Sequence, residues 1–204
     1  INLNLAVAQI ERGNLTLARS ILADIERSSE SLPKSTPSRL KGYITGYTAL
    51  CEHLGGSFEA ARQGYRKSLK KFEKRRELRA IGIFKRHFGD LHLANGDLEE
   101  AERDIKLAMN AASQAQQRDI WNMAQASYAR LLIAQGKLQQ AGSYIQQIRA
   151  YSENMGLYGL RAQALQMEAL LLIKRGELGP AAGCAAHAIA LSSRYGMRLR
   201  KLSR

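Results

Sequence analysis

The fold of this chain is decided by a phrase that reads Ala94-Asn95-Gly96-Asp97-Leu98-Glu99-Glu100-Ala101 and returns 40 residues later as Ala134-Gln135-Gly136-Lys137-Leu138-Gln139-Gln140-Ala141. The same order of residue types recurs at 175–181 and, more loosely, at 12–18 and 55–61. A sequence unit that recurs at a fixed spacing in this range is typical of a solenoid. The phrase therefore predicts stacked helix pairs in which glycine turns the chain and the following Leu and Ala pack the second helix.

The helical pattern on either side of each glycine divides the whole chain into such pairs. Apolar residues spaced three and four apart predict two helices per unit. The units expected are 1–30, 39–76, 78–116, 118–155 and 157–195, followed by a partial sixth repeat at 197–204. We interpret 1–204 as a single solenoid. Because the chain does not begin with Met and the sixth repeat is cut short, we expect it to be a fragment of a larger chain.

Composition and charge restrict the compartment and the class of partner. Lys and Arg number 31 against 18 Asp and Glu, which gives a net charge of +13. Such a charge favours an acidic partner, whether a protein, a nucleic acid or an anionic membrane surface. No apolar run approaches the roughly 18 residues of a membrane span. Two distant cysteines, Cys51 and Cys184, indicate a reducing compartment, so we expect a cytoplasmic location.

The units resemble the tetratricopeptide repeat (TPR). The fourth unit shows the motif most clearly, with Ala129 on its first helix, Gly136 at the turn, and Leu138 and Ala141 on the second helix. The period near 40 is similar to the longer variant in kinesin light chain, the Leu-Gly-Asn polarity proteins, Rap-type regulators and large ATP-dependent transcription activators. The resemblance implies an all-α, right-handed superhelical solenoid of about five helix hairpins plus a truncated sixth repeat. It also implies a non-catalytic protein-interaction scaffold.

The resemblance further implies a concave groove lined by the first helix of each unit. The groove positions carried over are Arg86, Asp90, Leu93, Met123, Arg130, Ile133, Gln166, Leu170 and Ile173. These are mostly apolar, which favours an amphipathic helix or an extended segment of a protein partner, read partly by Arg130. Arg86 and Asp90 are one helical turn apart and are expected to pair. The alternative is that the apolar groups are covered by the next helix or by a neighbouring domain.

A second candidate surface is a run of basic residues after Gly56. Its members are Arg62, Arg66, Lys67, Lys70, Lys71, Lys74 and Arg75. Four of them recur every fourth residue and therefore share one helix face. The run is either a solvated outer face or a docking surface for an acidic protein segment or a nucleic-acid backbone. A nucleic-acid-binding helical repeat is therefore the alternative function.

Catalytic and metal chemistry find no support in the sequence. The four histidines are scattered and lack the ligand spacing of a zinc site. Cys51 and Cys184 fall within the helical pattern and are expected to pack as small apolar groups. Glu168 occupies a position that usually carries a large apolar side chain, and we expect it to reach solvent. The sequence thus predicts no catalytic residues, no metal site and no cofactor.

Overall fold

The computed structural model describes residues 3–30 and 37–197, and this part of the chain is entirely α-helical apart from its turns. Ten helices follow one another in the described ranges. They are α1 (Leu3–Arg12), α2 (Leu15–Glu30), α3 (Pro37–Gly55), α4 (Phe58–Lys74), α5 (Leu78–Asn95), α6 (Leu98–Gln114), α7 (Arg118–Ala134), α8 (Leu138–Asn154), α9 (Tyr158–Arg175) and α10 (Leu178–Arg194). The predicted all-α architecture of five helix hairpins is confirmed. The predicted sixth repeat lies, except for Met197, outside the described residues.

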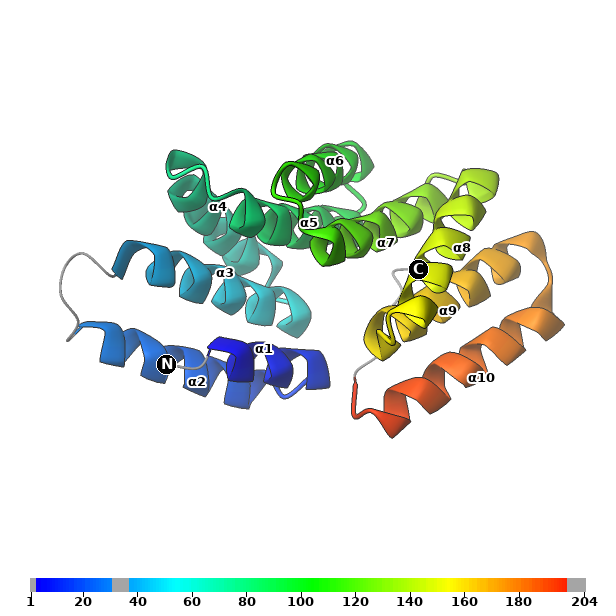
Figure 1. Ribbon diagram of the computed structural model, residues 1–204, viewed down its shortest axis with the longest axis horizontal. Helices are drawn as coiled ribbons and strands as arrows, with labels where there is room; N and C mark the ends of the chain where they lie inside the picture. The colour runs from blue at the N-terminus through cyan, green and yellow to red at the C-terminus, as the bar shows by residue number, and fades with distance from the viewer. Residues whose placement is uncertain (1–2, 31–36, 198–204) are drawn as a thin grey trace.

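The hairpins are stacked side by side along an arch (Figure 1). Each helix packs against the next one in sequence, and the first helices of successive hairpins (α1, α3, α5, α7 and α9) also contact one another. Hairpins that touch only their neighbours are what a repeat solenoid requires. The first helices therefore form one continuous layer, and their sequence differences determine what this layer presents.

The corner within each hairpin is made by a glycine in the left-handed conformation. At the third hairpin, Gly96 has a φ of 82°, and the backbone N–H of Asp97 donates to the carbonyl of His92 at 2.9 Å. This arrangement satisfies a carbonyl that the end of the helix would otherwise leave without a partner. The phrase that opened the sequence analysis is thus the hairpin corner, and glycine is there because a Cβ would strain the backbone.

The turns that follow the second helix of a hairpin also place one residue in the left-handed conformation, but this residue is not always glycine. Gly156 and Gly196 occupy this position after α8 and α10, but Arg76 (φ 52°) and Gln116 (φ 53°) occupy it after α4 and α6. A side chain in this conformation costs roughly 1–2 kcal/mol relative to a right-handed residue. The turn after α4 therefore carries a strained arginine where the scaffold would accept glycine.

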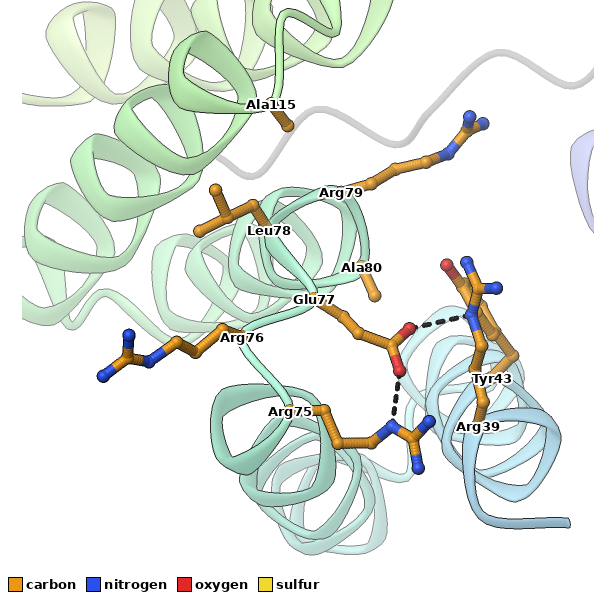
Figure 2. A pocket seen from close by; sticks show the side chains of 9 residues that line it. All are labelled: Arg39, Tyr43, Arg75, Arg76, Glu77, Leu78, Arg79, Ala80 and Ala115. Atoms are coloured by element: carbon orange, nitrogen blue, oxygen red, sulfur yellow. Dashed lines mark hydrogen bonds and ion pairs between the residues drawn. The ribbon is translucent and has the colours of Figure 1, made fainter. Parts of the chain in front are cut away.

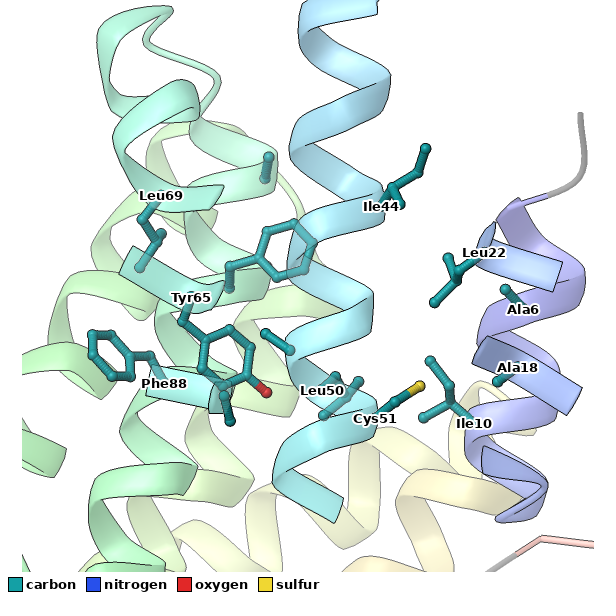
Figure 3. Packing of buried hydrophobic residues seen from close by; sticks show 14 of the residues in the cluster. Ala6, Ile10, Ala18, Leu22, Ile44, Leu50, Cys51, Tyr65, Leu69 and Phe88 are labelled. Carbon is teal, nitrogen blue, oxygen red and sulfur yellow. The ribbon is translucent and has the colours of Figure 1, made fainter. Parts of the chain in front are cut away.

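The core is divided between two large clusters and a smaller one between them. The N-terminal cluster joins α1 to α5, and Figure 3 shows α3 at its centre, between Leu22 on one side and Tyr65 on the other. The fully buried residues of the C-terminal cluster are aliphatic or Met, among them Ile145, Met167 and Leu171, and tyrosines pack against their edge. The hydrophobic stripe of every helix from α3 to α9 is therefore buried between its neighbours, which supplies the main stabilisation of the solenoid.

Candidate functional site

The first helices meet in a buried network of charged side chains. Arg130 on α7 donates from Nη2 to Asp90 Oδ1 at 2.6 Å and to Ser127 Oγ at 3.0 Å. Arg86 Nη1 lies 3.5 Å from Asp90 Oδ2, and its Nη2 lies 2.8 Å from His87 Nε2. Arg86 and Asp90 are each only 6% exposed. One carboxylate thus holds two guanidinium groups and ties α5 to α7.

The structure separates the predicted groove residues into three environments. Leu93 and Ile133 are buried in the interfaces between hairpins, together with Arg86 and Asp90 of the charged network. Gln166 and Leu170 on α9 are half-buried, as is the side chain of Arg130. Met123 and Ile173 are 38% and 51% exposed. Of the nine predicted positions, those that a partner can reach therefore lie on α7 and α9, and the others are buried within the stack.

The predicted basic run lies on α4, mostly on its exposed side. The side chains of Arg66, Lys67, Lys70, Lys74 and Arg75 are exposed. Arg62 is less accessible and lies 3.6 Å from carboxylate oxygens of both Glu59 and Asp97. Burial lowers the pKa of Lys71, and the charges of Lys67 and Lys41 lower it further. Five of the seven residues thus form an exposed strip of positive charge on the second helix of hairpin two.

The C-terminal end of this strip leads into a group of arginines at the junction of α3, α4 and α5, which we name the basic corner. It comprises Arg39, Arg75, Arg76, Glu77 and Arg79. With Tyr43, Leu78, Ala80 and Ala115, these residues line a cavity of about 430 Å³. Arg75, Arg76 and Arg79 lie within the basic stretch 62–86 of the sequence, but nothing in the helical spacing indicates that Arg39, from the start of α3, meets the turn after α4.

Glu77 organises the basic corner. Its carboxylate lies 2.7 Å from Arg75 Nε through Oε1 and 2.8 Å from Arg39 Nε through Oε2 (Figure 2). The charge of Glu77, followed by that of Tyr43, raises the pKa of Arg39. Arg79 extends over the same side of the corner as Arg39 in Figure 2. Three arginines therefore share one side of the corner, and a single half-buried carboxylate opposes them.

A second buried polar group, which the sequence analysis did not single out, joins α5 to α6. Asp104 is almost fully buried, and its Oδ1 accepts a hydrogen bond from Lys85 Nζ at 2.9 Å. Its Oδ2 lies 3.6 Å from His92 Nε2. A buried charge must be paired, and here the partners come from the facing helix. This group stabilises the third hairpin, and Lys85 also links it to the second hairpin through an ion pair of 3.9 Å with Glu73 on α4.

Nothing in the described residues favours nucleophilic or metal chemistry. Burial raises the pKa of the Cys51 thiol to about 11, and burial also raises the pKa of Cys184. A thiol with a raised pKa stays protonated near neutral pH and is a poor nucleophile. Within the described ranges, histidine, cysteine and acidic side chains do not gather in a group of three that could hold a metal ion. Glu168 is half-buried, and its carboxylate is held by Arg149 at 3.0 Å.

The stacked hairpins place this chain in the class of TPR-like helical-repeat folds, and comparison with solved structures confirms the predicted resemblance. BtubC (BKLC) from P. vanneervenii matches with a TM-score of 0.67 and 15% identity, over 98% of this chain and 82% of that one. A chain described as a putative kinesin light chain with nearly identical TPR-like repeats, from Podosopora anserina, matches with a TM-score of 0.56 and 16% identity. That match covers 95% of this chain and 94% of the other.

A second structure of the Podosopora chain, with one residue substituted, gives a TM-score of 0.58 at 16% identity over the same shares of the two chains. No protein-family model matches this chain, and no curated protein matches it in sequence. Identities this low establish a shared fold. None of the helices in the described ranges is both long and apolar enough to cross a membrane.

Proposed function

We propose that this chain is a non-catalytic interaction scaffold or sensor segment that binds a peptide, helix or domain of a protein partner. The partner lies against the first helices of the last two hairpins. We place the chain in a cytoplasmic signalling or transcription-regulatory protein. The TPR-like fold supports a protein-interaction role in general, because stacked repeats create an extended binding surface.

The observation that carries this proposal is the exposure of Ile173. It occupies on α9 the position that Leu93 holds on α5 and Ile133 on α7, and both of these are buried where the following hairpin packs. Ile173 is 51% exposed among the described residues, and the partial sixth repeat expected at 197–204 lies outside them except for Met197. On α5 and α7 this position packs against the next hairpin, so the same position on α9 is suited to contact a helix. The partner element that fits is therefore the apolar face of an amphipathic helix.

The positive charges next to Ile173 indicate which kind of partner helix would bind there. Lys174 and Arg175 follow directly in the last turn of α9, and both are exposed. A partner helix that places an apolar residue on Ile173 brings its neighbouring positions close to these two cations. Acidic residues at those positions would speed association and select the partner. The proposed ligand is thus an amphipathic helix with acidic flanks.

Site-specific photo-crosslinking tests this assignment. A photoreactive residue placed at Ile173 should crosslink a protein partner in cell extract, whereas one placed at the exposed Gln146 of α8 should not. The Ile173→Glu variant should then lose the same partner by about tenfold or more in affinity, because burying a carboxylate against apolar groups costs more than about 1.4 kcal/mol. Equal crosslinking from both positions, or unchanged affinity of Ile173→Glu, would contradict the proposal.

Nucleic-acid binding is the second candidate function, and the exposed strip Arg66, Lys67, Lys70 and Lys74 on α4 favours it. Binding through phosphate contacts weakens steeply with salt, because each neutralised phosphate releases counterions. Titration of a single-stranded RNA at rising salt, with Lys70→Glu as the variant, distinguishes the two functions. A steep salt slope that Lys70→Glu reduces and Ile173→Glu leaves unchanged would favour nucleic acid over the protein partner.

A further inference from the structure

The turn after α4, which forms the basic corner, can be compared with the turns after α6 and α8. These two turns show which residues the connection between hairpins needs. The turn after α6 reads Ala115-Gln116-Gln117 with Asp119 as the second residue of α7. The turn after α8 reads Met155-Gly156-Leu157 with Gly159 in the same place. These turns connect hairpins of the same architecture without any arginine at the compared positions. The arginines of the basic corner are therefore additions to the architecture.

Their arrangement makes the hydrogen-bonding ends of two arginines accessible to a ligand. Glu77 is contacted by the Nε atoms of Arg39 and Arg75, so these ion pairs do not engage the terminal nitrogens of either guanidinium, and the Arg39 side chain also hydrogen-bonds with Tyr43. A planar guanidinium binds an oxyanion through two parallel N–H donors. The side chains of Arg39 and Arg75 are 62% and 47% exposed, so a ligand can reach them. The corner thus presents two guanidinium forks that a single carboxylate holds close together.

The cavity adds two features that favour a negative ligand. Leu78, Arg79 and Ala80 belong to the first turn of α5 and line the cavity, so the amino end of an 18-residue helix faces it. The amino end of a helix carries a partial positive charge and attracts anions. Arg79 adds a third guanidinium on the same side (Figure 2). A hydrogen bond of 3.1 Å from its Nη1 to the neutral Gln117 side chain steadies it. Three guanidinium groups and the carboxylate of Glu77 together carry a net charge of about +2, which matches a ligand with two negative charges.

We infer that the basic corner binds the phosphate of a phosphorylated side chain on a protein partner, with Arg39, Arg75 and Arg79 as its ligands. The inference rests on the proposed protein-interaction function, to which it adds a second contact point. A phosphate monoester carries close to two negative charges at neutral pH and three acceptor oxygens, enough for two forks and a third arginine. A cavity of about 430 Å³ is large enough for one phosphorylated side chain.

A peptide titration tests the site with a defined probe. The probe is a short glycine peptide with one phosphoserine, and its twins carry serine or aspartate instead. The phosphopeptide should bind at least about tenfold more tightly than either twin, because it offers more acceptor oxygens and more charge to the three guanidinium groups. Its affinity should fall as the pH is lowered through about 6, where the phosphate loses its second charge.

Three arginine variants separate directed contacts from general charge. Arg75→Gln and Arg79→Gln should each weaken phosphopeptide binding by about tenfold. Arg79 is not paired with Glu77, so Arg79→Gln keeps the inference testable if Arg75→Gln unfolds the corner. Arg76→Gln removes the same charge from the residue that points away in Figure 2, and it should change affinity less than about threefold.

Three results would overturn the inference. They are equal binding of the phosphopeptide and its aspartate twin, equal losses from Arg75→Gln and Arg76→Gln, and binding seen only with single-stranded RNA or with vesicles that contain a phosphoinositide. Ile173→Glu alters only the proposed helix site, so it should leave phosphopeptide binding at the basic corner unchanged. If Ile173→Glu loses the helix partner but still binds the phosphopeptide, the helix site and the phosphate site are independent of each other.

Discussion

The interface between hairpins two and three and the interface between hairpins four and five have the same architecture but different packing. In the first, the rings of Phe72 and Phe84 stack with centroids 5.6 Å apart, and a Cβ on Gly46 would overlap the Phe84 ring. In the second, Ala164 stands where Phe84 does and Ala126 where Gly46 does. A large ring over a glycine in one interface thus corresponds to two small alanines in the other.

The comparison also explains why the basic corner lies where it does. Tyr43 packs against both Phe72 and Phe84 and also lines the cavity of the corner. Closely packed aromatic rings hold the side chains above them in fixed positions. The arginines therefore lie beside the most aromatic part of the core.

The largest expected effect comes from removing the ring that distinguishes the first interface. Phe84→Ala should lower the free energy of unfolding by about 4 kcal/mol, because a fully buried ring is lost and its neighbours collapse only partly. Urea unfolding followed by circular dichroism measures it. A loss below about 1.5 kcal/mol, the usual cost of a volume-conserving swap, would show that the ring is not a central packing element.

The charged network between α5 and α7 has no counterpart at Leu170 in hairpin five, and this difference can be measured. Asp90→Asn should lower stability by about 3 kcal/mol, because it leaves the buried Arg86 without a full negative partner. Leu170→Asn, at the equivalent half-buried position, should cost less than about 1.5 kcal/mol. Thermal unfolding of the two variants compares them directly, and equal losses would show that the network does not contribute beyond ordinary burial.

Reciprocal substitutions at equivalent positions sharpen the contrast in packing. Gly46→Ala should destabilise by about 1–3 kcal/mol, because the added Cβ collides with Phe84. Ala126→Gly, at the equivalent place on α7, should destabilise by roughly 1–2 kcal/mol, through lower helix propensity and the loss of a buried methyl group. Combining Gly46→Ala with Phe84→Leu should recover part of the loss in the first case, as urea unfolding of the three variants would measure. Stabilisation by Gly46→Ala would contradict the ring-on-glycine packing.

The ion pairs of the basic corner should have a smaller effect. Glu77→Gln should lower stability by about 1 kcal/mol, because both arginine partners are largely exposed and exposed pairs contribute little. The difference in free energy of unfolding between Glu77→Gln and the unsubstituted chain should shrink at high salt, because screening weakens the ion pairs that only the unsubstituted chain has. Urea unfolding at low and high salt measures it. A loss that is independent of salt would indicate that Glu77 acts through packing at the start of α5.

The smallest effect concerns the strained turn and has the opposite sign. Arg76→Gly should raise stability by about 0.5–1 kcal/mol, because glycine adopts the left-handed conformation without strain. Gln116→Gly should behave in the same way, and Gly156→Ala should lower stability by a similar amount. Differential scanning calorimetry resolves shifts of this size as changes in melting temperature. A loss of stability in Arg76→Gly would mean that the arginine side chain holds the turn.

The candidate sites were predictable only in part. The exposed strip on α4 follows from residues four apart, because a single helix places them on one face. The burial of Leu93 and Ile133 was one of two alternatives that the sequence left open, since it depends on how closely the next helix approaches. Asp90 shows the same limit: its pairing with Arg86 lies within one helix and was expected, whereas its shorter contact with Arg130 crosses between helices.

The sequence by itself determined the helices, the glycine corners and the 40-residue stacking, because these depend on local backbone preference and on periodicity along one helix. Only the tertiary structure decided which first-helix residues remain accessible, and only it brought Arg39 to Glu77 across 38 positions of sequence. Such contacts are set by the distances between packed helices. The repeated phrase around Gly96 and Gly136 therefore specifies the scaffold, and the packing of its unlike copies creates the surfaces that we propose for binding.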